Sequence, residues 1–177
     1  MMNKTFIISG EVHGGKTIFA NNLASLMAEK GFIIDGFVCP GIFENAERSA
    51  FYIRFLATGD KIPYAKKEQV PKWISFKRFY FNPAALEKGN GLLKTLTGEA
   101  RKVVFVDELG RWELEGGGWS EGVRLLVQKP DLIKILVVRT AFVNEVITKF
   151  NLQNTVVLNI QNESVQKAYD VITDNKI

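Results

Sequence analysis

Apolar residues along the chain alternate between strand-like runs and segments with helical spacing. The strand-like runs, which are rich in β-branched and aromatic residues, have the sequences TFIISG, FIIDGFV, KVVFVDE, LIKILVV and TVVLNI. Between these runs, apolar residues recur at intervals of three and four, as on the buried face of a helix. Strands that alternate with helices predict an α/β fold, with a mostly parallel sheet covered by helices on both faces.

The helical segments have recognisable beginnings and ends. The first carries Phe19, Leu23 and Met27 and ends before Gly31, a residue that tolerates a left-handed conformation. A second is predicted from Pro83 towards Gly98, with proline near its start. Three further apolar stripes consist of Val123, Leu126 and Val127; Phe142, Val146 and Phe150; and Val165, Ala168, Tyr169 and Ile172.

The middle of the chain, from Gly41 to Phe81, has a different pattern. The runs SAFYIRFLA and KIPYAKK flank Thr58-Gly59-Asp60, which has the residues of a tight turn. We therefore expect an antiparallel hairpin inserted into the α/β fold. With no internal repeat or linker in its 177 residues, the chain is expected to form one domain, residues 1–177.

Composition narrows the class of protein. Hydrophobic residues make up 46% of the chain and charged residues 24%, which is typical of a folded globular protein. Cys39 has no cysteine partner, and the N-terminus lacks the order of a signal peptide, so a cytoplasmic location is expected. No apolar run reaches the roughly 20 residues of a membrane-spanning helix. The net charge of +4 suits an anionic ligand.

Residues 10–17, GEVHGGKT, match the phosphate-binding pattern G-x-x-x-x-G-K-[ST] between a predicted strand and a predicted helix. In such a loop the backbone N–H groups surround phosphate oxygens, Lys16 reaches the β and γ phosphates, and the Thr17 hydroxyl binds Mg²⁺. We expect a nucleoside triphosphate, such as ATP or GTP, and Mg²⁺ at this loop. The expected nucleotide-binding residues are Gly10, Glu11, Val12, His13, Gly14, Gly15, Lys16, Thr17 and Ile18.

His13 is the only histidine, which excludes a zinc site built from several histidines. It also excludes a Ser-His-Asp triad unless this loop residue serves in it. Within the loop, His13 either contacts the γ-phosphate or is simply a variable loop residue.

Two acids, Asp107 and Glu108, end the run KVVFVDE. Ligands gather at the carboxyl edge of a parallel sheet, so these side chains are expected to face the nucleotide. We assign Asp107 to the Mg²⁺ shell and Glu108 to activation of the attacking water. The alternative is that both acids begin a solvated turn.

These motifs together resemble a family of P-loop nucleoside triphosphatases that includes the cancer-related nucleoside triphosphatases and their bacterial and archaeal relatives. The family's acidic motif, D-E-[IL]-G-x-x-E-L, is matched by Asp107, Glu108, Leu109, Gly110, Glu113 and Leu114. The arginine of VVRTAFV, Arg139, matches a family arginine. The resemblance implies a RecA-like fold, Mg²⁺-dependent hydrolysis of several nucleoside triphosphates, and Glu108 as the activator of water.

Other features allow two interpretations each. Arg111 and Arg139 follow strand ends, and either could neutralise the transferred phosphoryl group or be a surface cation. The three glycines before Trp119 could form a lid with Trp119 or Trp112 stacked on a base, or a plain loop.

The segment from Ala65 to Phe81 interleaves lysine and arginine with aromatic residues, a pattern found in proteins that bind single-stranded nucleic acid. Edge strands also carry lysine to block aggregation, and we favour that interpretation. A nucleic-acid partner is therefore not expected.

The sequence predicts a Mg²⁺-dependent nucleoside triphosphatase in a three-layer α/β P-loop domain. Two alternatives stay open at this point. A small-molecule kinase would hold its acceptor near the hairpin, and a nucleotide-binding adapter would turn over little.

Overall fold

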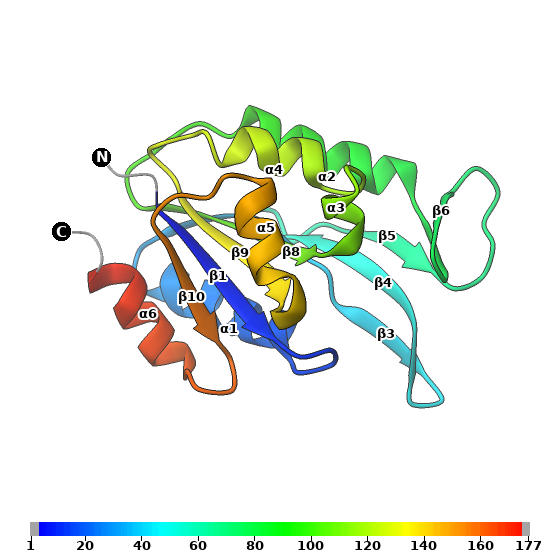
Figure 1. Cartoon of the computed structure of the whole chain (residues 1–177), viewed down its shortest axis with the longest axis horizontal. Helices are drawn as coiled ribbons and strands as arrows, with labels where there is room; N and C mark the ends of the chain where they lie inside the picture. Colours follow the sequence, from blue (N-terminus) through cyan, green and yellow to red (C-terminus); the bar gives the residue numbers. More distant parts are fainter. Residues whose placement is uncertain (1–3, 175–177) are drawn as a thin grey trace.

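The computed structural model describes residues 4–174 (Figure 1). In this part of the chain the strands are β1 (Thr5–Gly10), β2 (Ile33–Val38), β3 (Gly41–Glu44), β4 (Glu47–Phe55), β5 (Lys61–Lys66), β6 (Ile74–Phe76), β7 (Phe79–Phe81), β8 (Lys102–Leu109), β9 (Ile133–Arg139) and β10 (Thr155–Asn159). The helices are α1 (Lys16–Glu29), α2 (Pro83–Thr95), α3 (Arg111–Leu114), α4 (Ser120–Leu126), α5 (Val143–Lys149) and α6 (Val165–Asp174), with a 3₁₀ turn, η1 (Thr140–Phe142).

All of these strands belong to one sheet, in the order β10-β1-β9-β8-β2-β4-β5-β7-β6, with β3 paired to β4. The strands from β10 to β2 are parallel, and the pairs beyond β2 are antiparallel. Because β9 lies between β1 and β8, the residue at its end, Arg139, enters between the loop after β1 and the acids at the end of β8.

Helices cover both faces of the sheet, which confirms the predicted three-layer α/β architecture (Figure 1). Side chains of α2, α4 and α5 pack on one face around Leu93, Val123 and Val146. Side chains of α1 and α6 pack on the other, around Leu23 and Ile172. The apolar stripes of the sequence therefore correspond to the buried faces of these helices.

The predicted hairpin is the pair β4–β5, and the antiparallel part of the sheet is larger than this hairpin. Three further short strands, β3, β6 and β7, extend it. Each is only three or four residues long. Two of them, β6 and β7, lie in the segment from Ala65 to Phe81 and are separated by charged residues. Such short strands carry little periodic signal in the sequence.

Two local predictions agree with the backbone. Gly31, just after α1, has φ = 80°, the left-handed conformation expected at a helix end. Pro83 is the first residue of α2, and the Asn82 side chain caps this helix by accepting a 3.1 Å hydrogen bond from the Ala84 N–H.

Among residues 4–174, no helix combines the length and apolarity needed to cross a membrane.

Candidate active site

The loop between β1 and α1 has the backbone of a phosphate cradle. Gly15, which precedes α1, has φ = 88°, a conformation that a side chain would strain. The Gly14 N–H donates to the Glu11 carbonyl at 3.1 Å, and the Lys16 ammonium group donates to the same carbonyl oxygen at 2.6 Å. Partial burial lowers the pKa of Lys16 below its usual value. The lysine is thus folded back over the loop.

A pocket of about 200 Å³, hereafter the loop pocket, opens over this turn. It brings together most of the sequence-predicted nucleotide-binding residues with parts of β3, β4, β8 and β9. It is lined by Val12, His13, Gly14, Gly15, Lys16, Thr17, Ile18, Pro40, Gly41, Phe43, Arg48, Glu108 and Arg139. Gly10 does not line it but packs against Ile160, and Glu11 contributes its carbonyl to the loop.

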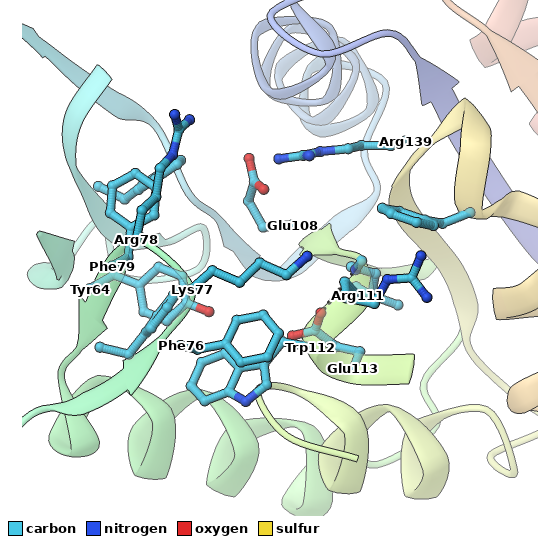
Figure 2. A pocket seen from close by; sticks show the side chains of 15 residues that line it. Tyr64, Phe76, Lys77, Arg78, Phe79, Glu108, Arg111, Trp112, Glu113 and Arg139 are labelled. Atoms are coloured by element: carbon cyan, nitrogen blue, oxygen red, sulfur yellow. Dashed lines mark hydrogen bonds between the residues drawn. The ribbon is translucent and has the colours of Figure 1, made fainter. Parts of the chain in front are cut away.

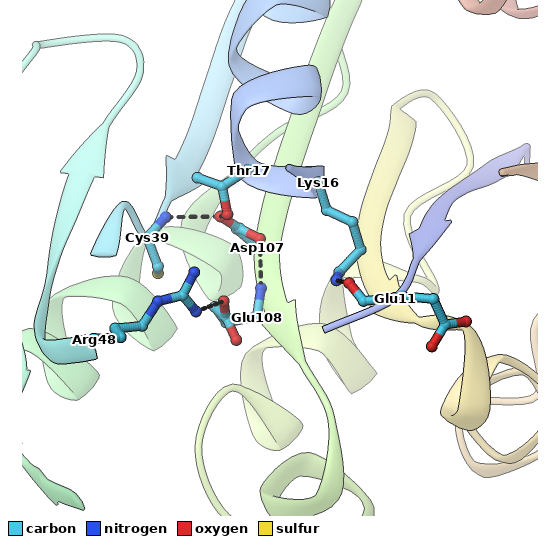
Figure 3. A network of polar contacts seen from close by, with 7 residues as sticks. All are labelled: Glu11, Lys16, Thr17, Cys39, Arg48, Asp107 and Glu108. Carbon is cyan, nitrogen blue, oxygen red and sulfur yellow. Dashed lines mark hydrogen bonds and ion pairs between the residues drawn. The ribbon is translucent and has the colours of Figure 1, made fainter. Parts of the chain in front are cut away.

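The Asp107 carboxylate lies next to the Thr17 side chain and is hydrogen-bonded to it (Figure 3). The Thr17 hydroxyl donates to Asp107 Oδ2 at 2.8 Å, and the Cys39 N–H donates to the same oxygen at 2.9 Å. The Glu108 N–H donates to Asp107 Oδ1 at 2.8 Å. Burial raises the pKa of Asp107, and these three hydrogen bonds oppose the rise. The carboxylate therefore fixes the direction of the Thr17 hydroxyl.

Glu108 leaves the regular strand at an irregularity in β8. The pairing of β8 with β9 shifts register between Val106 and Leu109, and Glu108 has φ = 65°. A bulge re-aims side chains at the end of a strand, and a non-glycine residue with positive φ indicates strain held by the surrounding structure. The consequence is that Asp107 points towards Thr17 and Cys39 while Glu108 faces the pockets.

The Glu108 carboxylate sits among cations at the floor of the loop pocket. Burial is the main cause that raises its pKa to about 7, and repulsion from Asp107 adds to it. Arg48, Arg139 and Lys16 act in the opposite direction. Arg48 lies 3.8 Å from Glu108 Oε1, and Figure 2 shows the Arg139 guanidinium group directed towards Glu108. A carboxylate with a pKa near neutrality suits a general base.

Arg48 is a site residue that sequence reasoning missed. Its side chain is 17% exposed, lines the loop pocket and lies over the rings of Phe43 and Phe51. No motif connects it with the phosphate loop, because only the packing of the β3–β4 hairpin brings it to Glu108. Of the two arginines that follow strand ends, Arg139 lines the loop pocket, whereas Arg111 pairs with Glu145 at 3.8 Å.

Hydrogen bonds and close packing hold the glycine-rich segment after α3 in place. Glu113 is 2% exposed, and its two carboxylate oxygens accept the N–H groups of Gly110 at 2.9 Å and Trp119 at 3.1 Å. A side chain at Gly117 or Gly118 would clash with Trp112 or Glu113, so the glycines permit close packing.

Trp119 is therefore a core residue. It is fully buried and contacts the rings of Phe37 and Tyr64, with centroid distances of 4.6 and 4.9 Å. Of the interpretations left open for the glycine segment, stacking of Trp119 on a base is excluded, because this side chain is fully buried in the core. Trp112 remains half-buried at the edge of a second pocket.

His13 is exposed and has φ = 60° at the tip of the loop. Its ring lies 6.5 Å from that of Phe43, edge to face. Desolvation and the nearby cations, Arg48 first among them, lower its pKa. A neutral imidazole is therefore favoured beside the loop.

The residues present fit a Mg²⁺ ion that is bound together with nucleotide. Among residues 4–174, no cluster of three or more His, Cys, Asp or Glu side chains could hold a metal. Mg²⁺ in nucleotide sites uses one or two protein oxygens together with phosphate oxygens and water. Because the Thr17 hydroxyl donates its hydrogen bond to Asp107, the lone pairs of its oxygen stay available for a cation.

Fold and site together define a P-loop nucleoside triphosphatase. A family model described as NTPase matches residues 5–173, and the chain belongs to this family. A nucleoside-triphosphatase THEP1 from Methanopyrus kandleri is 27% identical over 124 residues, which are 70% of this chain and 67% of the relative.

Two solved structures share the fold. The solution structure of a human cancer-related nucleoside triphosphatase superposes with a TM-score of 0.73 at 18% identity, covering 98% of this chain and 97% of the other. The crystal structure of THEP1 from Aquifex aeolicus gives a TM-score of 0.67 at 20% identity, covering 97% and 96%. The family model and the relative confirm the predicted family and enzyme class, and the two superpositions confirm the predicted fold class.

Proposed function

We propose that the protein hydrolyses nucleoside triphosphates to diphosphate and phosphate in a Mg²⁺-dependent reaction at the loop pocket. The observation that carries the proposal is the position of Glu108, a carboxylate with a pKa of about 7 that shares this pocket with Lys16 and Thr17. Family membership supports the same activity. The substrate is the nucleoside triphosphate, and the preferred base stays open.

In this mechanism the loop backbone and Lys16 hold the β and γ phosphates. Glu108 takes a proton from a water molecule on the far side of the γ-phosphate. The water oxygen forms a bond to γ-phosphorus while the bond from γ-phosphorus to the β–γ bridging oxygen breaks. Thr17, oriented by Asp107, would hold Mg²⁺, which when bound neutralises charge on the phosphate oxygens.

Cations around Glu108 would act on the same transition state. Arg48 and Arg139 both line the loop pocket, and guanidinium groups can stabilise charge that develops on the transferred phosphoryl group. Their charge also limits the rise in the pKa of Glu108. The two effects support a stabilised transferred phosphoryl group and an ionised base near neutral pH.

The test is phosphate release by the purified protein with ATP, GTP, CTP and UTP, each with Mg²⁺ and with excess EDTA. We expect release with at least one triphosphate, and loss of release in EDTA that added Mg²⁺ restores. Absence of turnover in a folded protein that binds nucleotide would leave the adapter function. Release that becomes much faster only when a hydroxyl acceptor is added would favour a kinase.

A further inference from the structure

A second and larger pocket, hereafter the aromatic pocket, adjoins the loop pocket (Figure 2). Its volume is about 370 Å³, within the range of small-molecule sites. It lies between the antiparallel strands β4, β5 and β7 on one side and α3 with η1 on the other. Glu108 and Arg139 line both pockets, so the two sites meet at the proposed base.

Aromatic rings form one side of this pocket. Phe76 and Trp112 are stacked, with centroids 5.3 Å apart and ring planes 16° from parallel. The centroid of the Phe81 ring lies 4.3 Å from that of Trp112 and 5.2 Å from that of Tyr64. Phe76 and Trp112 are only half-buried, so this apolar surface is partly open to the pocket. Such a surface suits a flat aromatic molecule.

Cations line the same pocket, some of them next to the rings (Figure 2). Lys77, Arg78, Arg111 and Arg139 all line it, and all are exposed. Within residues 4–174, Lys77, Arg78 and Arg139 take part in no salt bridge, and Arg111 has only the 3.8 Å contact with Glu145. Figure 2 shows the Lys77 side chain extended across the pocket. Exposed cations beside an aromatic surface suit an anionic group on the same ligand.

The base of the bound triphosphate does not occupy this pocket, because of the direction in which the nucleotide lies. The loop holds the triphosphate so that its γ end lies at Glu108, and the nucleoside lies at the opposite end of the phosphate chain. The aromatic pocket therefore lies on the side from which a nucleophile attacks. This step rests on the proposed function, because it uses Glu108 as the group beside the γ-phosphate.

We propose that the aromatic pocket binds a second ligand, a planar aromatic compound with a phosphate group, of the size and chemistry of a nucleoside monophosphate. The rings of Phe76 and Trp112 contact its aromatic part, and Arg78 and Lys77 bind its phosphate. The ligand is bound at the same time as the triphosphate and next to its γ-phosphate.

The same residues belong to the segment from Ala65 to Phe81 that could have indicated nucleic-acid binding. Stacking along a strand needs successive aromatic residues that lie open along a surface. Here the aromatic side chains Phe76, Phe79 and Phe81 converge on one pocket with Trp112. One base-sized ligand therefore fits the arrangement better than a polymer.

The test is calorimetry with the full chain saturated with Mg²⁺ and a non-hydrolysable ATP analogue, so that the loop pocket is filled. The probes are AMP, GMP, CMP and UMP, with the corresponding nucleosides and inorganic phosphate as controls. We expect at least one monophosphate to bind with one-to-one stoichiometry, and its nucleoside and phosphate to bind at least tenfold more weakly. Binding should also quench the fluorescence of Trp112, a signal that Trp112→Phe removes.

Two variants test the assignment to this pocket. Arg78→Ala removes a cation and Phe76→Ala removes a stacking ring, and each should weaken monophosphate binding about tenfold or more. Lys72→Ala is the matched control, since Lys72 is an exposed lysine of the same segment that does not line the pocket. It should leave the affinity unchanged. Lys16→Ala should impair triphosphate binding and leave monophosphate binding intact.

Three results would overturn the inference: no monophosphate binding by the loaded protein, binding that the triphosphate analogue abolishes, or equal affinity for nucleosides. Tighter binding of a single-stranded oligonucleotide that weakens steeply with salt would also overturn it, and would assign the segment to nucleic acid. Monophosphate binding without any triphosphate hydrolysis would retain this site and remove the proposed function. The two proposals can therefore fail separately.

Discussion

The Thr17 hydroxyl donates a 2.8 Å hydrogen bond to Asp107, which joins the first turn of α1 to the end of β8. The two residues are 90 positions apart in the chain, and in the sheet β9 separates β1, which precedes α1, from β8. The same carboxylate accepts the N–H groups of Cys39 and Glu108. One buried carboxylate thus fixes the direction of the Thr17 hydroxyl and the backbone that carries Glu108.

This bond predicts how Mg²⁺ dependence changes in Thr17→Val. Valine keeps the shape of threonine but removes the hydroxyl, so the proposed metal ligand and the donor to Asp107 are both lost. We expect hydrolysis to need about tenfold or more Mg²⁺ for half-maximal rate. Titration of Mg²⁺ at fixed nucleotide measures this. Thr95→Val, at the end of α2, is the control and should titrate like the parent protein.

Lys16→Ala should abolish tight triphosphate binding while the protein stays folded. Within the described residues, the Lys16 ammonium group hydrogen-bonds only to the Glu11 carbonyl, and Lys16 belongs to neither hydrophobic cluster. Calorimetry with ATP and GTP measures the affinity, and circular dichroism checks the fold. Lys30→Ala, an exposed lysine at the far end of α1, should bind like the parent. Parental affinity in a folded Lys16→Ala protein would contradict the assignment of the loop.

Much of this architecture was accessible from the sequence because it depends on local chemistry. The loop pattern between a strand and a helix requires glycine, lysine and threonine at fixed spacing, and Gly15 has the positive φ that such a turn needs. The buried faces of the helices could be predicted from the spacing of apolar residues, which is also a local property of the sequence. The two acids at the end of β8 were found because strand ends in a parallel sheet meet at one edge.

The parts that escaped sequence reasoning depend on contacts between distant segments. Arg48 reaches Glu108 only through the packing of the β3–β4 hairpin, and nothing in its own neighbourhood distinguishes it from a surface arginine. The bulge at Glu108 is a mismatch between two strands, so neither strand alone encodes it. The glycines before Trp119 have the composition of a flexible lid, but Glu113 holds them against the core.

Glu113→Ala should destabilise the protein by roughly 2–4 kcal/mol. The substitution leaves the N–H groups of Gly110 and Trp119 without an acceptor in a buried environment, and each such group costs about 1–3 kcal/mol. Urea unfolding measures the change in free energy. Glu115→Ala is the control, because Glu115 is exposed two residues further on, and its stability should stay within about 0.5 kcal/mol of the parent. An unchanged midpoint for Glu113→Ala would show that the loop does not depend on this carboxylate.

Glu108→Gln should keep nucleotide binding and lose about 10² to 10⁴-fold in kcat, the usual contribution of a positioned general base. Glutamine preserves the shape of the side chain but cannot take a proton from water. Single-turnover phosphate release at saturating nucleotide measures the loss, and calorimetry checks binding. Glu115→Gln serves as the neutral control. Parental rates in Glu108→Gln would mean that another group positions the water.

The pH dependence of hydrolysis should follow the ionisation of Glu108. Its pKa is raised to about 7, chiefly by burial and then by the charge of Asp107, so a large fraction is protonated and inactive below neutrality. The active form is the carboxylate, and kcat/KM should therefore fall about tenfold per pH unit below 7 and level off above it. An unperturbed glutamate, with a pKa of about 4.3, would give a flat profile over that range.

The terminal phosphate of the substrate also titrates, at about pH 6 by analogy with other phosphate monoesters. Glu108→Gln retains that contribution, so the ratio of the parent profile to the Glu108→Gln profile isolates the glutamate. We expect this ratio to rise with pH, to be half-maximal near pH 7 and to reach its plateau about one pH unit higher. A ratio that is constant from pH 5.5 to 9 would show that the proton is not taken by Glu108, and the general-base role would have to be assigned elsewhere.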